Sequence, residues 1–320
     1  MEEVERARER LENIRGVKPI LSGLRTISLG SWQAALKRRS RVRAYGERLT
    51  AVLPALVPHL QTEQGVMSRL REHLPILRTP SGRDRAPRAT RAATPGHTAL
   101  VVGSERGLCG RFNVAVADET ERYLRRESSD GTSIELQVLG SRAQRVLSRR
   151  GFDSAQAGTL SVTTLPPISL AFELSRRWLT AYEAHEVDAV YLIYNAYRGT
   201  GAYEPSVARL IPPQLPAERM APSGQVAQDQ RPWPPPIIDT DPFSLYATVV
   251  EQWTVVRLYS VLLDSSAAEH ATRFQLMESA TQNADQLIED LTLVIQTARR
   301  QEITQEMAEL ATGAGLLGRK

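Results

Sequence analysis

Residues 269–293 read EHATRFQLMESATQNADQLIEDLTL, and their apolar side chains return at steps of three, four or seven. This spacing places them on one face of an α-helix. The same spacing continues on both sides, and no proline or glycine interrupts the chain from Phe243 to Thr312. A helix of that length would form a rod of roughly 100 Å, far longer than a globular domain needs. We therefore expect it to pair with another long helix as a coiled coil.

The amino-terminal block is predicted to supply that partner helix. Apolar residues follow the same helical spacing there: Leu11, Ile14, Leu21, Leu24 and Ile27. Gly16, Gly23 and Gly30 fall seven residues apart and therefore share one helix face. They indicate either the close approach of another backbone or a weak helix, because each costs about 1 kcal/mol relative to alanine. Pro19 is expected to kink or break the helix because it lacks a backbone donor.

Between these blocks, short runs rich in Val, Ile, Leu and Tyr alternate with amphipathic segments. The runs are His97–Gly103, Ser133–Leu139 and Val187–Asn195, and the segments are Asn113–Arg126, Ser141–Arg150 and Ser169–Glu186. This alternation favours a Rossmann-like α/β domain with a largely parallel sheet. The predicted divisions are helices 1–60 and 242–320, an α/β domain 97–211, and linkers 61–96 and 212–241. Both linkers contain prolines and are expected to be irregular.

A glycine-rich turn, 100-LVVGSERGLCGRFN-113, joins the first predicted strand to a helix, an arrangement that cradles phosphate in many proteins. A phosphate loop needs GxxxxGK[ST] and a dinucleotide site needs GxGxxG, whereas Gly103 and Gly107 are spaced GxxxG. The pattern instead predicts a tight turn with unusual backbone angles. Cys109 is expected to be a small buried residue, since the five histidines are scattered and indicate no catalytic relay and no metal site.

The composition excludes several classes of protein. Lys and Arg total 40 against 36 Asp and Glu, which does not mark a nucleic-acid-binding chain. No apolar run is long enough to span a membrane, and the acidic start MEEVERARERLEN is unlike a signal or transit peptide. A single cysteine precludes a disulfide within the chain and suits a reducing compartment. No cofactor is indicated.

With these blocks laid out, the chain resembles the gamma subunit of F-type ATP synthases. The turn SERGLCGRFN at 104–113 is similar to that family's SDRGLCGGFN. The longest match joins 269–293 to 298-ARRQEITQEMAELATGAGLL-317, where the family has an apolar IDxLTL and a terminal ITxELxEI. A weaker match is 10-RLENIRGVKPILSGLRTIS-28. Departures from the family pattern, Pro19 among them, indicate a divergent or alternative form.

The resemblance implies an antiparallel coiled coil of the terminal helices with the α/β domain against its lower end. It further implies a central rotor stalk that turns inside a ring of alternating alpha and beta subunits. Such a stalk couples ion flow through the membrane sector to conformational change at catalytic sites on the beta subunits, so the chain is not an enzyme by itself. The other implied partners are the epsilon subunit and the membrane c-ring, with no nucleic acid and no direct membrane insertion. The implied location is peripheral, on the cytoplasmic side of a bacterial or equivalent energy-transducing membrane.

The family's contacts with the ring carry over by position. Leu24 and Arg25 match the contact of the amino-terminal helix, and Arg300 stands where the family usually has glutamine. The residues that match the contact near the end of the carboxyl-terminal helix are Arg299, Arg300 and Thr304. The turn residues that the resemblance assigns to the globular foot, where the family meets the epsilon subunit and the ion ring, are Arg106, Gly107, Cys109 and Gly110.

Two other functions stay open at this point. One is a nucleotide-binding α/β enzyme with coiled-coil arms, which would need a phosphate loop. The other is a coiled-coil scaffold without a motor role. The basic cluster 37-KRRSRVR-43 fits either a solvated helix face or a surface that faces acidic lever segments of the beta subunits.

Overall fold

The computed structural model describes residues 2–61, 96–128, 132–161, 164–199, 201–212 and 238–313. The chain divides into two compact units. The terminal unit consists of Met1–Leu29 and Arg273–Lys320, and the central unit of Gly30–Thr272. The two predicted linkers, 61–96 and 212–241, fall almost wholly outside the described residues.

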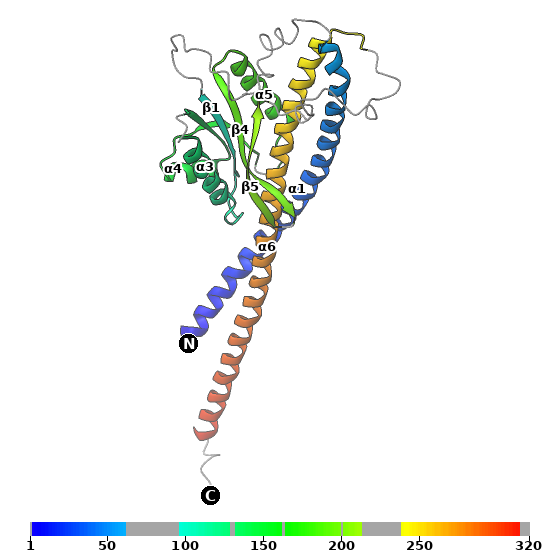
Figure 1. The fold of residues 1–320 in the computed structure, drawn as a ribbon. Helices are drawn as coiled ribbons and strands as arrows, with labels where there is room; N and C mark the ends of the chain where they lie inside the picture. The colour runs from blue at the N-terminus through cyan, green and yellow to red at the C-terminus, as the bar shows by residue number, and fades with distance from the viewer. Residues whose placement is uncertain are drawn as a thin grey trace. The chain divides into compact units, whose positions relative to one another are not determined.

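Two long helices and a set of shorter elements make up the described chain (Figure 1). They are α1 (Glu2–Gln61), β1 (Gly96–Val102), α3 (Phe112–Ser128), β2 (Ile134–Leu139), α4 (Ser141–Arg149), β3 (Ala155–Gly158), α5 (Ile168–Glu183), β4 (Val187–Gly199), β5 (Ala202–Ile211) and α6 (Pro242–Gly313). The long helices at the two ends and the α/β arrangement between them agree with the fold class predicted from the sequence.

The central unit contains one five-stranded sheet with the order β3-β2-β1-β4-β5. The first four strands are parallel, and β5 runs antiparallel to β4. In the centre of the sheet, Val101 of β1 is paired with Val138 of β2 and with Ile193 of β4. The chain order reverses between β1 and β4, which makes this boundary the topological switch point of a doubly wound sheet.

Helices cover both faces of the sheet (Figure 1). Successive residues of a strand point to opposite faces. Accordingly, Ala99 and Val101 are buried in a cluster with α3 and α4, whereas Leu100 and Val102 are buried in a larger cluster with α5, α6 and part of α1. The near-continuous apolar run in β1 follows from this burial on both faces.

In the central unit, α1 and α6 pack as antiparallel neighbours. Arg39 Nε lies 3.0 Å from Asp264 Oδ1, and a Cβ placed on Gly46 would lie 3.1 Å from Val256. The later residue on α1 thus meets the earlier residue on α6. Arg38 adds a hydrogen bond of 3.3 Å to the hydroxyl of Tyr259.

In the terminal unit the same two helices are also antiparallel. Lys18 forms an ion pair with Asp285, and Arg25 forms one with Glu278 at 2.8 Å. A step of seven residues forward on α1 therefore corresponds to seven residues back on α6. In this register Glu2 falls opposite Gln301, so the last turns of α6 extend beyond the start of α1.

The three glycines of α1 that lie seven residues apart do not mark a close helix contact. A Cβ on Gly16, Gly23 or Gly30 would meet no atom within 4 Å, so the expected approach of another backbone is not found. The glycines face open space. Helix α1 also continues through Pro19, so the break that was one of the two expectations for this residue is not found. Among the predicted seam residues, Ile27 is 49% exposed.

Candidate functional site

Arg25, one of the two predicted ring-contact residues of α1, is engaged within the chain. Its Nη1 atom lies 2.8 Å from Glu278 Oε2 on α6, and both side chains are about one-third exposed. Leu24, beside it, is partly buried. A partner that contacts this part of α1 would therefore meet a neutralised pair of side chains.

The other three predicted contact residues, Arg299, Arg300 and Thr304, are exposed on α6. The Thr304 hydroxyl donates a hydrogen bond of 2.8 Å to the backbone carbonyl of Arg300. The structure thus brings these three residues together on the last turns of α6. Their contact with a ring stays a prediction.

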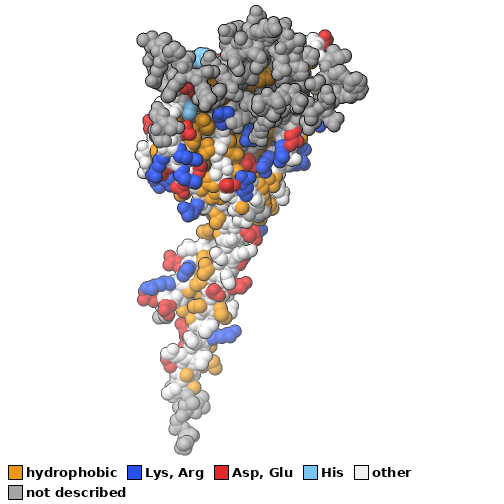
Figure 2. Space-filling model, in the orientation of Figure 1, with side chains coloured by type: hydrophobic (Ala, Val, Ile, Leu, Met, Phe, Trp, Pro, Cys, Tyr) orange, Lys and Arg blue, Asp and Glu red, His pale blue; other side chains and the backbone are white. Residues whose placement is uncertain are grey.

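The same end of α6 carries an exposed apolar stripe. Ile303, Met307 and Leu310 are spaced four and three residues apart and share one helix face. Met307 is 65% and Leu310 is 73% exposed. Figure 2 shows apolar side chains open to solvent along the helices of the terminal unit. Exposed apolar side chains gathered in one stripe are typical of a protein-interaction surface.

The glycine-rich turn after β1 is held by its own polar side chains. Asn113 accepts a hydrogen bond from the backbone of Ser104 (2.9 Å) and donates one to its hydroxyl (2.8 Å). The Ser104 hydroxyl donates to the carbonyl of Arg106 at 2.7 Å. The backbone of Gly110 has φ 58°, in the left-handed region that glycine adopts without strain. The tight turn predicted from the glycines is confirmed.

Cys109 is buried at this turn, as expected, with 2% of its surface exposed. It packs in a small cluster with Phe112 and with Ala268 of α6. Arg106, by contrast, is exposed, and Gly107 lies under the guanidinium of Arg142. The turn therefore has an inner side that seats on α6 and an outer side that is basic.

Two glycines bring the turn after β1 against the turn after β2. A Cβ on Gly140 would lie 2.7 Å from the carbonyl carbon of Gly103, and Gly140 also has φ 101°. A Cβ on Gly103 would collide with that of Ala143. These glycines allow two turns to approach each other closely. This explains why the sequence is rich in glycine, as a phosphate-binding loop is, but lacks the Lys and Ser/Thr of such a loop.

The amides that could cradle a phosphate at α4 are already occupied. Glu105 accepts a hydrogen bond of 3.0 Å from the backbone of Ser141, and the Ser104 carbonyl accepts one of 3.1 Å from Arg142. A carboxylate therefore takes the position at the start of α4 that an anionic ligand would need. This arrangement disfavours a nucleotide site at the turn.

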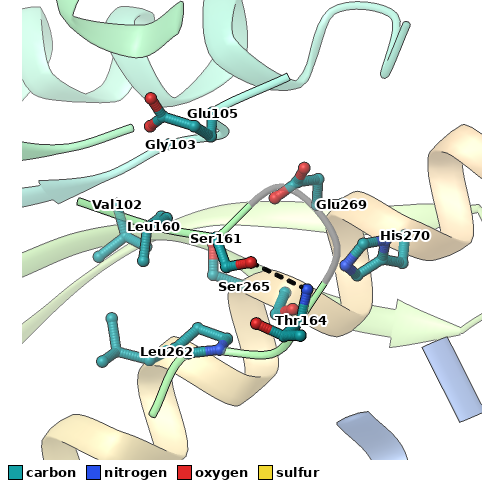
Figure 3. Close-up of a pocket in the computed structure, with 12 residues that line it drawn as sticks. Val102, Gly103, Glu105, Leu160, Ser161, Thr164, Leu262, Ser265, Glu269 and His270 are labelled. Atoms are coloured by element: carbon teal, nitrogen blue, oxygen red, sulfur yellow. Dashed lines mark hydrogen bonds between the residues drawn. The ribbon is translucent and has the colours of Figure 1, made fainter. Parts of the chain in front are cut away.

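A small cavity lies beside the carboxyl end of β1, where doubly wound sheets commonly hold a ligand. Figure 3 shows Ser161, Thr164 and Glu269 around it, with the Ser161 hydroxyl accepting a hydrogen bond from the Thr164 backbone at 3.1 Å. α6 passes along its other side and contributes Leu262, among other residues. The cavity measures about 20 Å³, room for roughly one water molecule and far too little for a nucleotide.

The basic cluster 37–43 divides between two directions. Lys37, Arg41 and Arg43 are exposed, whereas Arg39 turns toward α6 and Asp264. Asp264 is not among the residues predicted from the sequence. The sequence feature that could have identified Asp264 is an acidic residue within an otherwise apolar and small-residue run, 258-LYSVLLDSSAA-268.

Asp264 is a buried carboxylate surrounded by cations. Burial raises the pKa of Asp264 above its ordinary value, and the charges of Arg39, Arg198 and Arg257 oppose that rise. The backbone amide of Tyr197 also donates a hydrogen bond to it, which lowers the pKa. Burial is the larger effect, so the ionised form is held in the fold at some cost.

Two other kinds of site are absent from the described residues. No group of three or more His, Cys, Asp and Glu side chains there is arranged to hold a metal ion. None of the described helices is both long and apolar enough to cross a membrane.

A paired-helix stalk that carries a doubly wound α/β domain defines the class of this protein, and comparison with known proteins agrees with it. A family model described as ATP synthase matches residues 3–317, so the chain belongs to this ATP synthase family. Its similar relatives are gamma chains. One, the ATP synthase gamma chain of Methylobacterium sp. (strain 4-46), is 26% identical over 97% of this chain and 98% of its own. Another, from Anaeromyxobacter sp. (strain Fw109-5), is 27% identical over 97% of each.

Solved structures agree on the fold. A chain in the cryo-EM structure of the Euglena gracilis mitochondrial ATP synthase, OSCP/F1/c-ring, rotational state 3, has a TM-score of 0.56 at 14% identity. The match covers 99% of this chain and 97% of that one. A chain of the same organism's ATP synthase rotor, rotational state 1, has a TM-score of 0.55. The resemblance to gamma subunits that the sequence indicated is confirmed.

Proposed function

We propose that this chain is the central rotor stalk of a rotary F-type ATP synthase, coupling ion flow through the membrane sector to conformational change on partner beta subunits. The observation that carries the proposal is the antiparallel pairing of α1 and α6 in a chain of the gamma family. Lys18–Asp285 and Arg25–Glu278 show the register of that pair at seven-residue steps. A shaft needs such a fixed register because slippage between its helices would dissipate torque.

Under this proposal the catalytic sites belong to the partner subunits. The shaft is asymmetric, so its rotation angle changes the energy of its contact with each catalytic site. A partner that binds two conformations unequally shifts the population between them. The chain would thus act on catalysis through contact energy, without a reacting group of its own.

The proposed contacts with the ring lie at two places. Leu24 and Arg25 form one on α1, and Arg299, Arg300 and Thr304 form the other on α6. The exposed stripe of Ile303, Met307 and Leu310 supports the second place, since its apolar surface is available for burial against a partner. The exposed cations of cluster 37–43 fit acidic lever segments of the beta subunits.

We further propose the epsilon subunit and the membrane c-ring as partners of the α/β domain. Arg106, Gly107, Cys109 and Gly110 would belong to that foot, with Arg106 exposed and Cys109 buried. The complex would then be peripheral, on the cytoplasmic side of an energy-transducing membrane.

Native mass spectrometry of the complex purified through this chain tests the proposal. We expect one copy of the chain with alpha and beta subunits in a ring, and nucleotide-driven rotation of the chain in single-molecule recordings. A chain that purifies alone, or that binds nucleotide tightly by itself, would rule out the rotor. A Met307→Lys, Leu310→Lys variant is expected to weaken the ring contact while the far-UV spectrum of the chain stays unchanged.

A further inference from the structure

A buried carboxylate lies where three elements of the central unit meet. Asp264 of α6 is 8% exposed, and its Oδ1 lies 3.0 Å from Arg39 Nε on α1. The backbone amide of Tyr197, near the end of β4, donates a hydrogen bond to the same carboxylate. Asp264 therefore contacts both the other long helix and the sheet.

Neighbouring contacts join the same parts. The rings of Trp32 on α1 and Tyr197 on β4 lie 6.3 Å apart. One helical turn after Asp264, Ala268 packs with Cys109 of the glycine-rich turn. The sheet is thus attached to the helix pair by the large apolar cluster of the central unit, by ring packing, by the small apolar cluster at Ala268 and by the carboxylate.

The carboxylate contact differs from the apolar attachments because it joins two charged groups. Apolar surfaces tolerate small displacements because the hydrophobic effect has no direction. A buried charge that loses its partner remains in a medium of low polarity, so a displacement that separates Asp264 from Arg39 is costly. Buried ion pairs are weak evidence for stability, and their better-attested role is to fix one arrangement among several.

We propose that Asp264 and Arg39 are positioning residues that transmit torque between the helix pair and the α/β domain. This inference rests on the proposed function as a rotor. Removing the pair would leave the apolar packing in place while allowing the sheet to shift on α6 under load. If Asp264 lost its charge, Arg198 and Arg257 would also lose a nearby anion, which would add to this loosening.

The test uses the whole complex in inverted membrane vesicles, with ATP hydrolysis and ATP-driven ion pumping measured on the same preparation. Asp264→Asn and Arg39→Gln are each expected to lower the ions pumped per ATP by about twofold or more, while hydrolysis and subunit composition stay as in the parent. Asp264→Glu, which keeps the charge, should retain most of the pumping. Asp118→Asn is the matched control, because it removes a carboxylate of the central unit from an ion pair with Arg150 that involves neither α1 nor α6.

The outcomes distinguish a failure of this inference from a failure of the proposed rotor function. If the parent complex does not form or does not pump, the proposed function fails. If the parent pumps and both variants pump as many ions per ATP, the torque role of the pair is wrong. That role is equally wrong if hydrolysis and pumping fall together so that their ratio is unchanged. Should Asp264→Asn not assemble, Arg39→Gln decides, since the Arg39 side chain is one-third exposed.

Discussion

Helix α6 has two different surroundings along its length. In the central unit, apolar residues on all its sides are buried, among them Val255, Leu258, Val261, Leu262 and Leu263. In the terminal unit, burial follows a single seam through Met277, Thr281 and Ala284. A helix that is apolar all round belongs to a core, whereas a helix with one apolar seam pairs with a single neighbour.

The difference assigns different tasks to the two halves of one helix. The first half stabilises the fold, because burying each large apolar side chain contributes about 1.5–3 kcal/mol. The second half keeps residues such as Leu293, Met307 and Leu310 exposed. Their burial energy becomes available only when a partner covers them. The first half is therefore built for folding and the second for association.

The largest expected effect comes from making the same substitution, leucine to alanine, in each half of α6. Leu258→Ala removes a fully buried side chain and should lower the free energy of unfolding by about 2–5 kcal/mol. Leu293→Ala removes a side chain that is 65% exposed and should change it by no more than about 0.5 kcal/mol. Urea unfolding of the isolated full-length chain, followed by far-UV circular dichroism, measures both. Equal losses at the two positions would contradict the contrast.

A second pair of substitutions compares two glycines. Gly140→Ala places a Cβ 2.7 Å from the backbone of Gly103 at a positive φ, and should destabilise the central unit by about 1–3 kcal/mol. Gly23→Ala places a Cβ in open space on a helix, and should stabilise the terminal unit by about 0.5–1 kcal/mol. Hydrogen exchange of the amides in each unit follows the two changes separately. Loss of stability at Gly23 would show that its helix face is not open.

Much of this fold could be predicted because its signals are local. The spacing around Phe274, Met277 and Ala284 and the absence of proline specify a long paired helix. The alternation of strands and helices specifies the α/β domain. The glycine-rich turn was also interpreted correctly, since the missing Lys and Ser/Thr already argued against a phosphate loop.

The features that escaped prediction depend on contacts between distant residues. Gly16 and Gly23 share a helix face, but only the partner's position decides whether that face is covered, and it is open. Ile27 fits the helical spacing, yet it lies to the solvent side of the seam. Asp264 is similar: its partners Arg39 and Tyr197 are far away in sequence, and no local pattern joins the three.

The third prediction concerns pH and the buried carboxylate of the central unit. Because burial raises the pKa of Asp264 in the folded state, its protonated form favours folding, and this contribution is lost as pH rises from its ordinary value of 3.8 through the raised pKa. Asp264→Asn cannot titrate. The variant should therefore gain stability relative to the parent over that rise in pH, which urea unfolding at a series of pH values measures. A parent that gains on the variant as pH rises would mean that Arg39, Arg198 and Arg257 outweigh burial.

The smallest expected effect lies in the seam of the terminal unit. Lys18 and Asp285 are 39% and 46% exposed, so water screens their attraction. Asp285→Asn should cost about 0.2–1 kcal/mol at low salt, and the loss should largely vanish in about 1 M salt, where screening acts over only about 3 Å. Urea unfolding at the two salt concentrations measures it. A loss that persists at high salt would mean that this pair is effectively buried, and the distinction between a core half and an association half of α6 would then have to begin nearer the end of the helix.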